Sequence, residues 1–132
     1  MRRVPESIDE SMERAVLHQL PDHLRTEVLA LIQALRAVEG EEKFYLREIW
    51  IFGSHARSEA RLDSDVDILV LIDDRCSAKN PALLARRAIA KSNACLPYDL
   101  LVLRWSDWQS EKANRWTCYP DVERDRKLLY AR

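Results

Sequence analysis

The chain has 132 residues, of which 21 are Lys or Arg and 22 are Asp or Glu, so that its formal net charge is −1. This length corresponds to one domain, and the charge balance excludes a protein that holds nucleic acid by phosphate neutralisation alone. Direct nucleic-acid binding is therefore not favoured. Hydrophobic residues make up 47% of the chain, which is enough to bury a core and excludes the disordered class.

The cysteines and the N-terminus indicate a reducing compartment. Cys76, Cys95 and Cys118 form no C-x-x-C pair and have no histidine at zinc-finger spacing, so we interpret them as free thiols and small buried hydrophobic residues. The first ten residues lack the apolar stretch of a signal peptide, and no apolar run approaches the roughly 18 residues of a membrane span. We expect a cytoplasmic protein that does not associate with membranes.

Residues 1–40 predict two helices. Ser7–Glu10 has the S-x-x-E form of a capping box, and apolar residues follow at helical spacing as far as Leu20. Pro21 and Asp22 suit the first turn of a second helix, and Gly40 suits its C-terminal end. The apolar stripe of this second helix is Leu24, Val28, Leu31, Ile32, Leu35 and Val38.

Residues 44–103 predict three strands around one longer helix. The strands are expected at residues 44–52, 66–72 and 98–103, which are rich in β-branched, aromatic and other apolar residues. Gly53 and Ser54 end the first strand, and a short helix or turn follows to about Leu62. Asn80 and Pro81 predict the start of the longer helix, as N-cap and first residue.

The remaining segment, residues 104–132, is mixed, and Pro120 suggests a closing helix that continues through Leu128, Leu129 and Tyr130. Trp105, Trp108 and Trp116 either anchor this segment on the core or mark an interface. No linker divides the chain. We therefore expect one α/β domain over residues 1–132, with a single sheet layer and packed helices.

Two carboxylates interrupt the second strand. Asp65 and Asp67 are two residues apart, so their side chains point to the same face, and their charges are costly in an apolar strand. A divalent cation such as Mg²⁺ offsets this cost. Asp99 lies in the equally apolar third strand. If the two strands are neighbours, the three carboxylates converge in an arrangement that suits two metal ions and in-line nucleotidyl displacement.

The segment before these acids has the features of an anion site. Gly53 lets the backbone approach a ligand closely, and the N–H groups at a helix start favour an anion. The Ser54 hydroxyl adds a donor, and Arg57, one turn later, can pair with phosphate oxygens. A phosphate site beside a metal site is what a nucleoside triphosphate requires.

The stretch Ile51–Val70, IFGSHARSEARLDSDVDILV, resembles the signature of the DNA polymerase β-type nucleotidyltransferase superfamily, and in particular its minimal members. The resemblance implies a small mixed sheet with flanking helices, an α/β (α+β) fold, in which residues 44–103 form the catalytic sheet. It also implies that ATP is the substrate and Mg²⁺ the cofactor. One departure is Ser58, where the family usually has glycine.

The resemblance assigns roles to six residues. Gly53 and Ser54 would hold the β- and γ-phosphates, and Arg57 matches the arginine that follows the family's Gly-Ser turn. Asp65 and Asp67 would bind two Mg²⁺ ions. Asp99 would be the third metal ligand and would help to deprotonate the acceptor hydroxyl.

Minimal nucleotidyltransferases are paired with HEPN-family proteins, which are helical RNase-type toxins. Only 29 residues follow Leu103 (132 − 103), so we expect the acceptor surface to come from a partner or from a second copy in a homodimer. The leading hypothesis is an antitoxin of a type VII-like toxin–antitoxin system that transfers AMP from ATP to a tyrosine of a HEPN-type toxin. The alternatives are a nucleotidyltransferase that acts on a small molecule such as an aminoglycoside, and a non-catalytic antitoxin that binds and occludes its partner.

Overall fold

The computed structural model describes residues 19–57, 65–94 and 97–131 of the chain. The predicted helix over residues 7–20 therefore lies almost wholly outside the described residues. The described residues form these elements in chain order: α2 (Asp22–Ala37), η1 (Glu41–Lys43), β1 (Leu46–Phe52), α3 (Gly53–Ala56), β2 (Val66–Ile72), α4 (Pro81–Ala90), β3 (Tyr98–Arg104), α5 (Trp105–Glu111), α6 (Tyr119–Asp125) and β4 (Lys127–Ala131).

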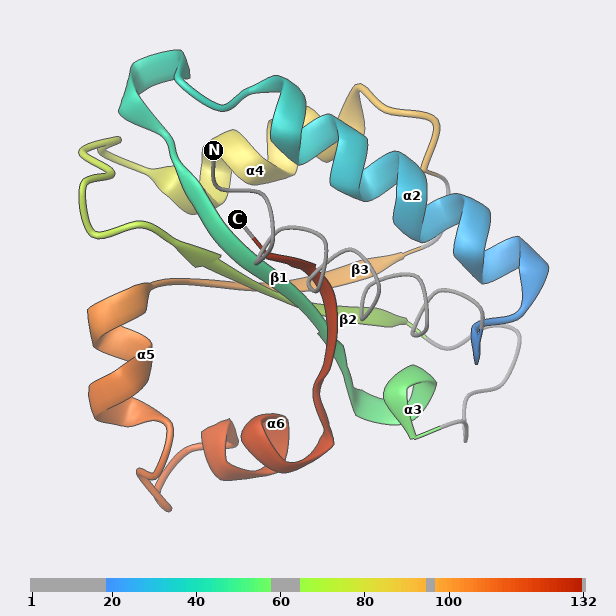
Figure 1. The fold of residues 1–132 in the computed structure, drawn as a ribbon, viewed down its shortest axis with the longest axis vertical. Coiled ribbons are helices and arrows are strands. Elements are labelled where there is room, and N and C mark those ends of the chain that lie inside the picture. The colour runs from blue at the N-terminus through green and yellow to red at the C-terminus, as the bar shows by residue number, and fades with distance from the viewer. Residues whose placement is uncertain (1–18, 58–64, 95–96, 132) are drawn as a thin grey trace, which may run out of the picture.

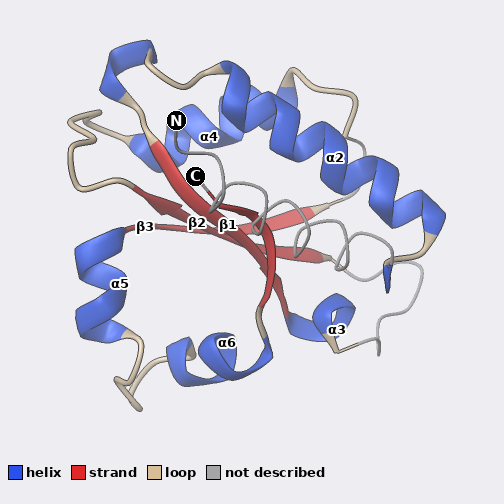
Figure 2. Ribbon diagram, viewed as in Figure 1, coloured by secondary structure: helices blue, strands red, loops and turns tan. Residues whose placement is uncertain are grey.

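The strands form one mixed sheet in the order β3-β2-β1-β4, which Figure 2 shows at the centre of the molecule. β1 is antiparallel to both β2 and β4, whereas β2 and β3 are parallel. Parallel neighbours need a long crossover, and α4 provides it. The predicted mixed sheet with flanking helices is confirmed.

Helices cover both faces of the sheet (Figure 1). α2 and α4 lie on one face, and α5 and α6 lie on the other. The strands alternate accordingly: in β2, Ile68 and Val70 belong to the larger core with α2 and α4, whereas Leu69 and Leu71 pack with the buried Trp108 of α5. Asp67 is two residues before Leu69, so it is on the α5/α6 face.

The two longer described helices begin where the sequence predicts. α2 starts at Asp22, directly after Pro21, and buries the predicted apolar stripe as far as Leu35. It ends at Ala37, and Gly40 lies in the following turn with φ of +90°. The Asn80 side chain caps α4 by accepting a hydrogen bond from the Leu83 N–H at 3.1 Å.

The prediction of a closing helix through Leu128, Leu129 and Tyr130 is wrong. Pro120 does lie in the first turn of a helix, α6, but this helix ends at Asp125, and residues 127–131 form the strand β4. The reason is tertiary: β4 pairs with the side of β1 that β2 leaves open, and this pairing buries Leu128 and Leu129. The sequence patterns also do not predict the short helix α5.

The tryptophans and cysteines divide between core and surface. Trp108 is completely buried, with its ring centroid 5.6 Å from that of Tyr119, so it anchors the C-terminal segment on the core. Trp116, in contrast, is 90% exposed. Cys76 is buried as predicted, whereas the prediction is wrong for Cys118, which lies at the surface just before α6. Cys95 lies outside the described residues.

None of the helices in the described part of the chain combines the length and the apolar character needed to cross a bilayer.

Candidate active site

Three acidic residues lie at the start of two neighbouring strands. Asp65 directly precedes β2, Asp67 is the second residue of β2, and Asp99 is the second residue of β3. Asp67 and Asp99 are register partners in the parallel ladder, so they lie side by side on the same face. The strands are therefore neighbours, as convergence of these acids requires. Asp67 is half-buried, and the other two are exposed.

The carboxylates influence one another electrostatically. Burial raises the pKa of Asp67 above its ordinary value of 3.8, and the negative charges of Asp99 and Asp65 raise it further. His55 and Arg57 act in the opposite direction. The Asp67 carboxylate therefore has something to gain from a nearby cation.

Gly53 brings the end of β1 against the three aspartates Asp65, Asp67 and Asp99, which we call the acidic row. The antiparallel register places Phe52 opposite Asp67, so the next residue, Gly53, begins α3 beside the Asp67 side chain. Gly53 has φ of +74°, and a Cβ at this position would overlap the Asp67 Oδ2 atom and come within 3.0 Å of its Cγ. Only glycine permits both this conformation and this approach.

The predicted helix or turn after β1 is short where it is described. α3 spans Gly53–Ala56, and the Arg57 N–H closes it by donating to the Gly53 carbonyl at 3.1 Å. Ser54 lies in the first turn and is half-exposed. Ser58 and the rest of the segment predicted to reach Leu62 lie outside the described residues.

Arg57 is close to the acidic row and also has a partner far away in the sequence. Its Nη1 donates to Asp125 Oδ2 of α6 at 3.1 Å, across a separation of 68 residues. Sequence reasoning missed Asp125, because nothing local to either residue indicates this pairing. Sequence reasoning also missed that His55 influences Asp67. The available signal was its position between Ser54 and Arg57.

The donor set suits a hard divalent cation. Carboxylate oxygens are the ligands that Mg²⁺ prefers, and a cation here would relieve the repulsion that raises the pKa of Asp67. Among residues 19–57, 65–94 and 97–131, however, no group of three or more His, Cys, Asp or Glu side chains is arranged to hold a metal ion. The metal-binding roles of Asp65, Asp67 and Asp99 therefore stay predictions.

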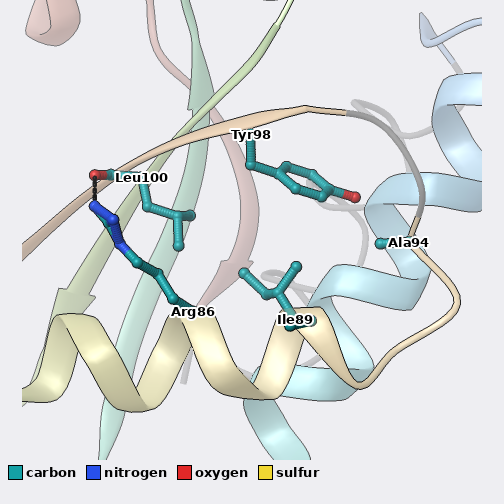
Figure 3. A pocket seen from close by; sticks show the side chains of 6 residues that line it. Arg86, Ile89, Ala94, Tyr98 and Leu100 are labelled. Carbon is teal, nitrogen blue, oxygen red and sulfur yellow. Dashed lines mark hydrogen bonds between the residues drawn. The ribbon is translucent and has the colours of Figure 1, made fainter.

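A pocket of about 310 Å³ lies on the other face of the sheet, between α4 and β3 (Figure 3). It is lined by Arg86, Ile89, Ala90, Ala94, Tyr98 and Leu100. The Arg86 guanidinium reaches the Leu100 carbonyl at 3.5 Å, as the dashed line shows. Tyr98 and Asp99 are consecutive in β3, so their side chains point to opposite faces, and this pocket is separate from the acidic row.

Comparison with known proteins identifies the family of the chain and a structure of similar fold. Residues 31–117, about two thirds of the chain, match the family described as Nucleotidyltransferase domain. Over 47 residues the chain is 49% identical to the protein adenylyltransferase MntA of Thermococcus cleftensis; the match covers 36% of this chain and 48%, about half, of that relative. A crystal structure from Sulfolobus solfataricus, assigned provisionally as a nucleotidyltransferase, has a similar fold, with a TM-score of 0.56 at 17% identity, covering 94% of this chain and 87% of that one.

Proposed function

We propose that this chain, which belongs to the nucleotidyltransferase domain family, is a nucleotidyltransferase that transfers AMP from ATP to a tyrosine hydroxyl of a HEPN-type partner protein. The observation that carries the proposal is the pairing of Asp67 with Asp99 directly beside the Gly53 turn. This places two carboxylates against a backbone segment that a triphosphate can approach.

The proposed reaction uses these residues in distinct ways. Gly53 and Ser54 hold the β- and γ-phosphates, and Arg57 pairs with phosphate oxygens. Asp99 accepts the proton of the tyrosine hydroxyl as its oxygen attacks the α-phosphorus. The bond between the α-phosphorus and the α,β-bridging oxygen breaks, and pyrophosphate leaves with the electron pair of that bond. Asp65, Asp67 and Asp99 would hold Mg²⁺, which would neutralise charge on the triphosphate.

A protein acceptor is supported by the relative from Thermococcus cleftensis, which is named a protein adenylyltransferase. The matched region includes only about half of that relative, so its activity comes to this chain as part of the proposal. The HEPN-type partner follows from the resemblance of the Ile51–Val70 signature to the minimal nucleotidyltransferases. A docked protein would hold its tyrosine in line with the α-phosphate, and positioning supplies much of the rate in such reactions.

The test is a transfer assay with ATP, Mg²⁺ and the product of the neighbouring reading frame, which the proposal expects to be a HEPN-type protein. Intact-mass spectrometry should show one or more AMP units on the partner, and peptide mapping should place them on tyrosine. Asp65→Ala should abolish the gain while the complex still forms on gel filtration. Asp107→Ala is the matched control, because Asp107 is an exposed acid on α5, outside the acidic row, and it should leave transfer unchanged. A partner that is inhibited without any gain in mass would show occlusion instead.

A further inference from the structure

Helix α6 contributes a partly buried acid to the neighbourhood of the Gly53 turn. Asp125 is the last residue of α6, and its side chain is only 11% exposed. Its Oδ2 atom accepts a hydrogen bond from Arg57 Nη1 at 3.1 Å. Helices α3 and α6 are packed together at this point. Asp125, which lies outside the Ile51–Val70 signature, thus holds Arg57, which lies inside it.

Asp125 is itself fixed from a second side. Arg124 Nε donates to Oδ1 at 2.9 Å, and Arg124 Nη2 donates to Oδ2 at 3.2 Å. These contacts keep the pKa of the Asp125 carboxyl below its usual range, with Arg124 the larger cause and Arg57 a smaller one. Asp125 is therefore a carboxylate whose charged form is favoured and which is shared between two guanidinium groups.

The ion pairs of this group hold Arg57 without adding net charge. Arg57 pairs with Asp125, Asp125 pairs with Arg124, and Arg124 pairs in turn with Asp121 at 3.3 Å, so the four side chains together carry no net charge, as +1 − 1 + 1 − 1. The Arg57 charge also reaches the acidic row, where it opposes the rise in the Asp67 pKa.

We propose that Asp125 is a positioning residue that holds the Arg57 guanidinium beside the Gly53–Ser54 turn, ready for the triphosphate of ATP. The inference rests on the proposed function, in which Arg57 pairs with phosphate oxygens. A free arginine side chain loses rotamer freedom when it binds a ligand, whereas one already held by a partner loses less. Asp125 therefore favours triphosphate binding without touching the nucleotide.

The test is a double-variant cycle on ATP affinity, measured with the full chain by calorimetry in the presence of Mg²⁺. Asp125→Asn should raise the Kd for ATP by roughly three- to tenfold, the factor expected when one side chain must be ordered on binding. In an Arg57→Ala background the same change should have no further effect. Asp125→Glu, which keeps the charge, should recover part of the lost affinity. In the transfer assay, KM for ATP should rise while kcat is unchanged.

Asp121→Asn is the matched control. Asp121 is on the same helix and forms an ion pair with Arg124 at 3.3 Å, but its side chain is 71% exposed. The substitution should leave the ATP affinity unchanged. Urea unfolding of every variant shows whether each protein tested is folded.

Each outcome decides something different. Unchanged or tighter ATP binding by Asp125→Asn overturns the inference and leaves the proposed function standing. A loss that persists in the Arg57→Ala background also overturns it, because Asp125 then acts by another route. The expected pattern without AMP on the partner's tyrosine supports the inference and refutes the proposed acceptor. A wild-type protein that binds no ATP with Mg²⁺ refutes both.

Discussion

Replacing Gly53 with alanine tests the closest backbone approach in the site. Two costs are expected: strain from placing an L-residue at φ of +74°, and the overlap of the new Cβ with the Asp67 carboxylate. A comparison with Gly40 separates the strain cost from the overlap cost, because Gly40 has φ of +90° and a Cβ added there would meet nothing within 4 Å. Gly40→Ala therefore measures strain without overlap in the same chain.

The magnitudes follow from these contacts. The left-handed conformation costs an L-residue about 1–2 kcal/mol, and the smaller entropy of the unfolded chain returns about 0.4–1 kcal/mol. Gly40→Ala should thus lower the free energy of unfolding by about 1 kcal/mol. Overpacking adds about 1–3 kcal/mol, so Gly53→Ala should cost about 2–4 kcal/mol.

Urea unfolding, followed by the fluorescence of the buried Trp108 and by circular dichroism, measures both variants. Asp67→Ala provides the internal check, because it removes the Oδ2 and Cγ atoms that are the two closest to the new Cβ and leaves the Asp67 Cβ at 3.3 Å. In that background the cost of Gly53→Ala should fall close to that of Gly40→Ala. Equal costs for the two glycine variants in the wild-type chain, or an excess at Gly53 that survives removal of the Asp67 carboxylate, would refute the reasoning.

Three further predictions concern single side chains. Asp67→Asn should abolish nucleotidyl transfer yet stabilise the metal-free protein by less than about 1 kcal/mol, since this carboxylate is partly solvent-screened. Because the folded-state pKa is raised, the charged form destabilises the fold above that pKa, and the gain in unfolding free energy should disappear as the pH falls below 3.8. Ser54→Ala should weaken ATP binding by about 1.5–3 kcal/mol in a thermal-shift titration, the range for one hydrogen bond to a charged group. A wild-type protein whose melting temperature does not shift with any nucleoside triphosphate would favour a pure binding module. Asn80→Ala should lower the free energy of urea unfolding by about 1 kcal/mol through loss of the α4 cap; an unchanged value would mean that the 3.1 Å contact to the Leu83 N–H contributes nothing.

The elements that carry strong local patterns could be predicted from the sequence. The period of 3.6 residues in α2, the Asn80–Pro81 start of α4 and the apolar run of β2 are each decided by nearby residues. The three apolar residues at 128–130 carry no such information, because a run this short fits a helix or a strand equally well. The open edge of β1 decides between them, and that edge is about 80 residues earlier in the chain.

The site residues also divide into those that local sequence predicts and those that only the fold brings together. The Gly53–Arg57 segment and the two aspartates at the start of β2 form one continuous signature, so the sequence predicts them together. Asp99 could be added because it interrupts a second apolar strand, and the ladder does place it beside Asp67. Asp125 has no such pattern: an acid in a charged segment becomes partly buried only because α6 folds back onto α3.

The order of strands in the sheet also sets an order of events during synthesis. β1 is the second strand from one edge, and the strand that completes it, β4, is made after every other described strand. Until residues 127–131 leave the ribosome, one side of β1 presents unpaired backbone groups next to Ile49 and Ile51, both of which the finished protein buries. Unpaired apolar edges recruit strands from other chains. Ribosome-bound chains that stop before β4 should therefore associate with one another or with chaperones, and release of the last strand should end that association.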